Sequence, residues 1–207
     1  MKKRLAAMIV LSTAFSSALA DGICPPATVE AKYGPFNYND PDAQANKLPI
    51  VEKFHFGPEV ENLVKGESSS LGGDLDYVLR SFPNHHRALN AMLRLARRDK
   101  TDKVPGAHFT VDCYFQRAMG FVPDDATVHL LYGNYLYGMK KYKESLDQYL
   151  EAEKLDPQNP NILYNAGLLY FDLKDYDKAL SYAKRAYAAG FPLQGLKFKL
   201  EKVGKWQ

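Results

Sequence analysis

Apolar residues recur three and four positions apart over most of the chain that follows Asp74, with polar residues between them. This spacing puts the apolar side chains on one face of an α-helix and predicts a series of amphipathic helices. Prolines at positions 83, 123 and 157 each follow such a run, and they are 40 and 34 residues apart. A period of this size predicts a stack of helical hairpins instead of one globular core.

One stretch of the chain is nearly repeated. The segment GNYLYGMKKYKESLDQYLEAEKLDP begins at Gly133, and GLLYFDLKDYDKALSYAKRAYAAGFP begins 34 residues later, at Gly167. Glycine has no Cβ and lets two helices approach closely, while Ala152 and Ala186 place small residues at matching positions of the second helix. One hairpin cannot bury its apolar face alone, so we expect the copies to stack.

These residues resemble the tetratricopeptide repeat family, whose 34-residue unit is a helical hairpin with small residues at fixed positions. The resemblance implies an all-α fold, a TPR-like helical-hairpin solenoid. With Gly133 at position 8 of the unit, positions 20, 27 and 32 hold Ser145, Ala152 and Pro157; with Gly167 there, they hold Ala179, Ala186 and Phe191, and Pro192 comes one residue late.

A more divergent copy precedes these two. Its first helix is expected to end near Arg98 and its second to run from about Thr110 to Phe121, with six extra residues in the turn RDKTDKVPGAH. Before this copy, GDLDYVLRSFP predicts a helix whose partner is a short helix of the N-terminal segment. The repeats should therefore begin with an incomplete pair.

Residues 21–66 differ from the rest because six prolines and four glycines interrupt any long periodic pattern. The segment is also rich in tyrosine and phenylalanine, which predicts an irregular N-terminal arm that packs against the repeats. Pro58 after Gly57 predicts one short helix in this arm, ending at about Lys65.

The end of the chain, PLQGLKFKLEKVGKW, predicts a C-terminal capping helix with Leu196, Leu200 and Val203 turned toward the stack. The whole division is then a signal peptide at 1–20, the arm at 21–66, repeats at 67–193 and the capping helix at 194–207. Within the repeats we expect a partial copy at 67–85, the divergent copy at 86–125, and two regular copies at 126–159 and 160–193.

The first twenty residues have the pattern of a secretory signal peptide. Lys2, Lys3 and Arg4 precede an apolar run, and Ala18-Leu19-Ala20 precedes the expected cleavage between Ala20 and Asp21. The short signal and its end look bacterial, which predicts a periplasmic protein. Asp21-Gly22-Ile23 before Cys24 does not fit a lipidation motif, and no later stretch is long and apolar enough to predict membrane insertion.

Removal of the signal changes the charge balance of the chain. It takes three of the 27 basic residues and none of the 24 acidic residues, so the mature chain is formally neutral. Bulk charge therefore gives no reason to expect nucleic acid or anionic lipid as a partner, and a protein or peptide partner is expected instead.

The only cysteines are Cys24 and Cys113. In an oxidising compartment such a pair is expected to form a disulfide bridge, which would tie the arm to the middle of the repeats. The alternative is two buried or reactive thiols. Neither cysteine lies in a Cys-x-x-Cys motif, so a redox or haem-binding role is not expected.

The resemblance also implies which side chains line the concave groove of the stack, because in this family the first helix of each hairpin faces the groove. Transferred to this chain, the partner-binding positions are Arg87, Asn90, Arg94 and Arg97 in the divergent copy, Asn134 and Tyr137 in the next, and Tyr164, Asn165, Leu168 and Phe171 in the last.

The arginines of the divergent copy have two interpretations. Arg87, Arg94 and Arg97 or Arg98 recur on one helix face, and guanidinium groups suit the carboxylates of a peptide or an acidic partner. The alternative is a basic face in solvent, or ion pairs with the acidic residues of the preceding segment, Glu67, Asp74 and Asp76.

Asn134 and Asn165 resemble the asparagine pair with which many of these domains bind the backbone of an extended peptide. The lysines that complete a carboxylate clamp in the family are replaced by Leu130 and Asn161, so capture of a chain terminus is not expected. What remains is a softer groove whose apolar anchors are Tyr137, Tyr164 and Phe171.

No catalytic or metal-binding motif stands out. His85 and His86 are adjacent and are expected to have neutral or capping roles at a helix start, and His55, His108 and His129 lack a histidine partner at helical spacing. The serines of GESSSLGGD have no placed base, which favours a flexible loop that caps the following helix. We therefore expect no cofactor, no metal and no enzymatic activity.

Two functions remain open from the sequence. The first is a periplasmic scaffold or assembly factor that holds a peptide segment in the concave groove. The second is an accessory subunit of an envelope enzyme, transport or secretion complex, which is contacted through the arm. The stretches LPIVEKFHF, FPNHHRAL and GFPLQGLKFKL also resemble small exported proteobacterial repeat proteins without a settled function.

Overall fold

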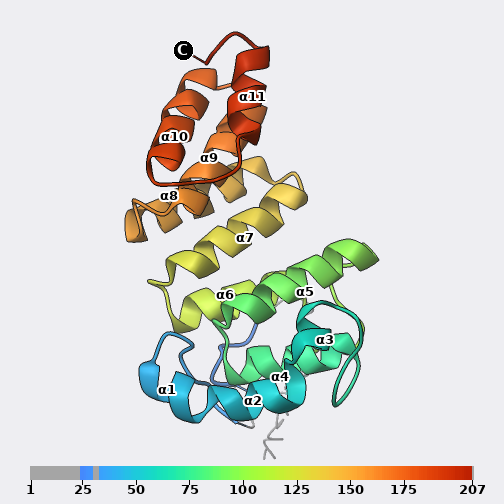
Figure 1. Cartoon of the computed structure of the whole chain (residues 1–207). Coiled ribbons are helices and arrows are strands. Elements are labelled where there is room, and N and C mark those ends of the chain that lie inside the picture. Colours follow the sequence, from blue (N-terminus) through green and yellow to red (C-terminus); the bar gives the residue numbers. More distant parts are fainter. Residues whose placement is uncertain (1–23, 30–32, 207) are drawn as a thin grey trace, which may run out of the picture.

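The computed structural model describes residues 24–29 and 33–206, and in these residues it contains helices and no strands. The helices pair along the chain and rise in one stack from the arm to the C-terminus (Figure 1). The expected all-α fold is therefore confirmed, whereas the expected signal peptide lies outside the described residues. The helices are α1 Pro41–Asn46, α2 Leu48–His55, α3 Pro58–Glu61, α4 Leu71–Ser81, α5 His86–Asp99, α6 Val111–Phe121, α7 Ala126–Gly138, α8 Tyr142–Leu155, α9 Pro160–Asp172, α10 Tyr176–Ala188 and α11 Gly195–Lys202.

The two regular copies form the hairpins α7–α8 and α9–α10, which pack closely within each pair. A Cβ at Gly133 would lie 2.5 Å from the ring of Tyr149 in α8. One at Gly167 would lie 3.2 Å from the Cβ of Tyr182 in α10 and 2.7 Å from Leu196 in α11. Lys140 and Lys174 adopt left-handed backbone angles at the same place in each turn, with φ of 61° and 64°. The repeat thus fixes both the close helix contacts and the turn between the helices.

The divergent copy is the pair α5–α6, and its helices begin and end close to the predicted residues. His85 caps α5 and Thr110 caps α6, each by accepting a hydrogen bond from a backbone N–H of the first turn. The extra residues of the turn, 100–110, leave the helical path between these two helices. The preceding helix α4 packs on α2 as well as on the short α3.

The N-terminal arm is more helical than expected, because it contains α1, α2 and α3 instead of one short helix. Pro58 begins α3 as expected, whereas Pro41 and Pro49, which were expected to interrupt helices, also stand in the first turns of helices. A proline is tolerated there because the first backbone N–H groups have no partner within the helix. The expected packing is confirmed, since Val51 and Phe56 of the arm are buried in the main core.

Cys24 and Cys113 form a disulfide, which confirms the expected bridge and excludes the alternative of two thiols. Beside it, the buried guanidinium of Arg117 donates hydrogen bonds of 2.9 Å to the carbonyls of Pro25 and Pro26. The start of the described chain is therefore attached to α6 by one covalent bond and by several charge-assisted hydrogen bonds.

The capping helix α11 packs on α9 and α10, with Leu196 and Leu200 fully buried as expected. The expectation for Val203 is wrong, because the helix ends at Lys202 and the Val203 side chain is 42% exposed. Trp206 packs at this end instead, edge to face on Tyr187. No helix among the described residues is long and apolar enough to cross a membrane.

Candidate partner-binding surface

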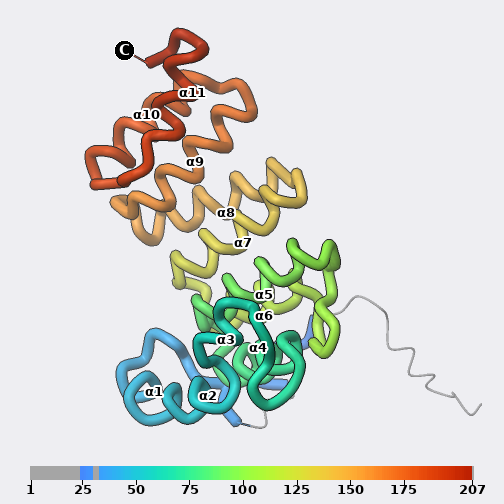
Figure 2. Tube along the Cα trace, turned by 45° about the vertical axis from the view of Figure 1, so that its right-hand side comes forward, coloured from blue at the N-terminus to red at the C-terminus, as the bar shows by residue number. Residues whose placement is uncertain are grey.

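The first helices of the successive hairpins, α5, α7 and α9, contact one another in order and form what we call the inner face (Figure 2). The arm returns to this face at its N-terminal end, because α3 packs on α5. The chain itself therefore covers part of the surface that the resemblance assigned to a partner.

Arg87 belongs to the covered part and is not available as a partner-binding residue. Its guanidinium forms a two-pronged ion pair with Glu61 and a further contact of 3.1 Å with Glu52, both in the arm. The hydrogen bond from Arg87 lowers the pKa of the Glu61 carboxyl below its usual value. The interpretation of Arg87 as a group paired within the chain is thus confirmed, but with acids of α2 and α3.

The acidic residues named for that pairing have other partners. Asp74 accepts hydrogen bonds from the backbone N–H groups of Glu67, Ser68 and Ser69, and it contacts His55 at 2.9 Å. The loop of GESSSLGGD is therefore held around a buried carboxylate instead of being free. The helix that follows begins at Leu71 with Ser70 as its cap.

Arg94 and Arg97 remain open to a partner. Arg94 donates one hydrogen bond of 3.4 Å to the carbonyl of Glu61, and Arg97 donates one of 3.5 Å to the carbonyl of Asn134. Among the residues that the structure describes, neither arginine forms an ion pair. By contrast, Arg98 pairs with the adjacent Asp99 at 2.8 Å. Asn90 is exposed on the same helix.

Two hollows adjoin at Arg97. One, of about 470 Å³, lies between α3 and α5 and is lined by Asn62, Leu63, Arg94, Arg97 and Arg98. The other, of about 320 Å³, lies between the C-terminal ends of α5 and α7 and is lined by Leu93, Ala96, Arg97, Lys100, Thr101, Asp102, Tyr135, Gly138 and Met139. The inner face is therefore hollowed beside Arg94 and Arg97, which form no ion pair in the described part of the chain.

Farther along the inner face, the expected asparagines are partly exposed and partly satisfied within the chain. The side-chain oxygen of Asn134 accepts a hydrogen bond of 2.8 Å from Tyr149, and the side-chain nitrogen of Asn165 donates one of 2.8 Å to the carbonyl of Asn161. Each amide therefore keeps one half for a ligand, the nitrogen of Asn134 and the oxygen of Asn165.

The apolar anchors expected in the groove, together with the expected partner-binding residue Leu168, divide into two groups. Tyr137, Leu168 and Phe171 are partly exposed on the inner face. The Tyr137 hydroxyl donates a hydrogen bond to Asp172, which links α7 to α9, and burial of the ring raises the pKa of Tyr137. These three side chains can contact a segment that lies along the face.

Tyr164 is the exception, because it is only 8% exposed. Its ring stacks on Phe191 at 3.8 Å, and its hydroxyl accepts a hydrogen bond of 3.2 Å from the backbone N–H of Leu196. The expectation that Tyr164 anchors a partner is therefore wrong. Phe191 stands at the position of the expected proline, and the loop before α11 covers the Tyr164 ring.

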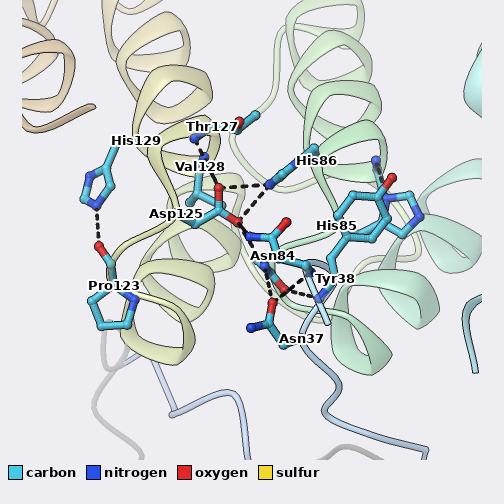
Figure 3. Close-up of polar contacts among 12 residues, drawn as sticks. Asn37, Tyr38, Asn84, His85, His86, Pro123, Asp125, Thr127, Val128 and His129 are labelled. Carbon is cyan, nitrogen blue, oxygen red and sulfur yellow. Dashed lines mark hydrogen bonds and ion pairs between the residues drawn. The ribbon is translucent and has the colours of Figure 1, made fainter. Parts of the chain in front are cut away.

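Sequence reasoning missed a polar network where the arm, α5 and α7 meet (Figure 3). The buried carboxylate of Asp125 contacts His86 at 2.8 Å and accepts hydrogen bonds from Asn84 and Asn39. Burial raises the pKa of Asp125, but hydrogen bonds from His86 and Asn84 outweigh it and hold the pKa below its usual value. The sequence does contain a signal for the helix-capping role of Asp125. The residue two places after each of the prolines at 83, 123 and 157 caps a helix, and these residues are His85, Asp125 and Asn159.

Other histidines also cap helices or contact buried carboxylates. His85 caps α5 as expected, and burial lowers its pKa. His55 and His108 contact the buried carboxylates Asp74 and Asp76 from other segments, which local spacing could not reveal. In the described part of the chain, no three His, Cys, Asp or Glu side chains are grouped so that they could hold a metal ion.

The regular copies match known families of repeats. Residues 133–174 match a family described as "TPR repeat", and residues 160–189 match "Tetratricopeptide repeat". The second range coincides with the hairpin α9–α10, and the first runs from the middle of α7 through α8 and α9.

Similar proteins share only short parts of their length with this chain. The Hsp70-Hsp90 organising protein of Plasmodium falciparum is 38% identical over 52 residues, which are 25% of this chain and 9% of that protein. Protein O-mannosyl-transferase TMTC3 of Homo sapiens is 29% identical over 106 residues, 50% of this chain and 11% of that protein. The chain thus spans about a tenth of the length of these curated relatives.

A solved structure titled "Functional Characterization of Pseudomonas Aeruginosa pilF" superposes with a TM-score of 0.56. The match covers 79% of this chain and 70% of that one, at 19% identity, and so it shows a shared fold. Residues 133–189 are therefore similar to tetratricopeptide repeats, and the chain shares its fold with this solved structure.

Proposed function

We propose that the chain is a non-enzymatic protein-interaction module of the periplasm, which holds a segment of a partner protein on its inner face. Stacked helical repeats form extended concave surfaces that serve for binding. The observation that carries the proposal is the pair of adjoining hollows beside α5, where Arg94 and Arg97 have no ion-pair partner among the described residues.

The rest of the inner face suits an extended peptide. The side-chain nitrogen of Asn134 and the side-chain oxygen of Asn165 have no hydrogen bond within 24–29 and 33–206, and such groups match the alternating donors and acceptors of a peptide backbone. Leu168 and Phe171 offer partly exposed apolar surface on α9. A partner segment that crosses α5, α7 and α9 would meet cations first and then amide and apolar groups.

The proposed compartment rests on two features. The sequence has the pattern of a secretory signal, and the disulfide between Cys24 and Cys113 suits an oxidising environment. Scaffolding or assembly of an envelope complex is the role that we favour for such a module.

A second candidate function uses the arm. Ile50 and Phe54 are each 52% exposed beside a hollow of about 270 Å³, which is also lined by Tyr33, His55 and Tyr77. An exposed apolar group of this kind can mark a protein contact. In this case the chain would be an accessory subunit, contacted at the outer side of α2.

Affinity capture from periplasmic extract with quantitative mass spectrometry separates the two candidates. Deletion of the arm is unsuitable because Val51 and Phe56 are core residues, so the arm is tested by replacing Ile50 and Phe54 with serine. The proposal expects a partner that is lost with Arg94→Ala combined with Phe171→Ala and kept with the arm variant. Loss in the arm variant alone would contradict it and support the accessory role.

A further inference from the structure

The arginines along α5 differ in what they contact. Arg87 is neutralised by Glu52 and Glu61, whereas Arg94 and Arg97 contact only backbone carbonyls among the described residues. A carbonyl compensates a guanidinium less than a carboxylate does, because charge-assisted pairs with carboxylates are stronger and two-pronged. The chain therefore neutralises the charge of Arg87 but not the charges of Arg94 and Arg97.

The contacts around Arg87 show what kind of segment fits α5. Helix α3 places Val60, which is fully buried, next to Glu61, whose carboxylate pairs with Arg87. The guanidinium of Arg87 also lies over the ring of Phe56, 5.2 Å from its centre. An apolar side chain followed directly by a carboxylate is thus the combination that already docks on this helix.

The surface around Arg94 and Arg97 offers the same two features, a site for an apolar side chain and a cation for a carboxylate. The hollow between α5 and α7 is lined by apolar groups of Leu93, Ala96 and Tyr135, and Met139 at its edge is 46% exposed. Arg97 lines both this hollow and the one beside Arg94. A carboxylate bound where the two hollows meet would therefore reach both guanidinium groups.

The turn after α5 shapes this hollow and gives it a direction. Lys100, Thr101 and Asp102 line one side, and they belong to the turn that is longer than in the regular copies. Lys100 and Asp102 carry opposite charges, so this side is formally neutral, whereas Arg94 and Arg97 make the other side cationic. A ligand carboxylate is therefore favoured toward Arg94, with the apolar group toward Met139.

We propose that this junction of α5 and α7 binds an acidic segment of a partner protein, in which an apolar side chain enters the hollow and an adjacent carboxylate pairs with Arg94 and Arg97. The inference rests on the proposed function and names the chemistry of the partner. The specificity lies in the extra turn of the divergent copy and in Arg94 and Arg97, which form no ion pair with any described residue.

The test uses the full chain and a fluorescent peptide, GPEVENLV, which copies residues 57–64 and so carries the combination seen on Arg87. Anisotropy titrations compare the wild type with Arg97→Gln and with Lys143→Gln, a control that removes one exposed positive charge from α8. Matched peptides are GPQVQNLV, which lacks the carboxylates, and GPESENLV, which lacks the first apolar side chain.

The proposal expects saturable binding of GPEVENLV that weakens about tenfold or more in Arg97→Gln and with GPQVQNLV, and that is unchanged in Lys143→Gln. GPESENLV should also bind more weakly. Equal binding of the acidic and amide peptides, or no binding of either, overturns the inference. Binding of phosphatidylglycerol vesicles in an Arg97-dependent manner without peptide binding would also overturn it.

These outcomes are separate from the test of the proposed function. If peptide binding fails but the captured partner is still lost with Arg94→Ala combined with Phe171→Ala, the inner face remains the binding surface and only the acidic chemistry is wrong. If the arm variant alone loses the partner, the proposed function fails whatever the peptides do.

Discussion

The two halves of this chain are stabilised by different means. The regular copies, α7 to α10, depend on residues that recur: glycine and alanine between paired helices and a left-handed lysine in each turn. The N-terminal half depends on unique contacts over long sequence distances, including a disulfide and the buried carboxylates Asp74, Asp76 and Asp125. A repeat can be stabilised by a local rule, whereas an irregular arm needs individual partners.

Loss of the disulfide should destabilise the N-terminal half more than any of the other substitutions described below. In the chain-entropy model, a bridge across a sequence separation of 89 contributes up to about 4 kcal/mol of folding stability. We expect Cys24→Ser combined with Cys113→Ser to lower the free energy of unfolding toward that amount, measured by urea denaturation. Unchanged stability would mean that Arg117 and its carbonyl partners hold the segment without the bridge.

The next largest effect is expected from Asp125→Ala. The change removes the cap of α7 and leaves His86, Asn84 and Asn39 without their shared acceptor, so it should cost about 3 kcal/mol. Asp124→Ala is the matched control, because Asp124 is exposed. If both variants unfold at the same urea concentration, the network does not stabilise the junction of arm and repeats.

Glycine substitutions should distinguish the repeat contacts from ordinary helix positions. Gly133→Ala places a Cβ against the ring of Tyr149 and should destabilise by about 1 to 3 kcal/mol. Gly120→Ala in α6 meets nothing within 4 Å and should stabilise by about 0.5 to 1 kcal/mol, because alanine is the better helix former. Thermal melts that shift in the same direction would contradict the role of close packing at Gly133.

A smaller, pH-dependent effect is expected at His85. Burial lowers the pKa of this histidine, so the folded state binds fewer protons than the unfolded state below the unfolded pKa of about 6.5. Its contribution to stability is therefore present above that pH and falls by up to about 1.4 kcal/mol per pH unit until the lowered folded pKa is reached.

Urea midpoints at pH 7.5 and 5.5 check the prediction for His85. Glu52 and Arg87 interact with the His85 ring and affect its charge. For this reason, His85→Gln is compared with the wild type at both pH values. The variant should show a smaller loss of stability at pH 5.5. A loss as large as that of the wild type would assign the pH dependence to other groups.

The fold was predictable where the sequence repeats itself. The spacing of Gly133 and Gly167 and the alanines of the second helices located α7 to α10, and the apolar period located α4, α5 and α6. The arm was less predictable, because a proline that starts a helix and a proline that prevents one look alike in a single sequence. Pro41 and Pro49 are of the first kind.

The candidate site was predictable only in part. Helical spacing put Arg87, Arg94 and Arg97 on one face, but it could not show that Glu61 of the arm returns to pair with Arg87. Nor could it show that the loop before α11 covers Tyr164. Both outcomes depend on contacts between distant segments, which the period of a repeat does not contain.

The measurement that tests the central claim most directly is photo-crosslinking in the native envelope, with a benzoylphenylalanine residue at position 139 or at position 54. Met139 borders the hollow of the inner face, and Phe54 lies on the outer side of the arm. The account predicts a protein adduct from position 139 that disappears when Arg97 is replaced by glutamine, and none from position 54. An adduct from position 54 alone would contradict the account.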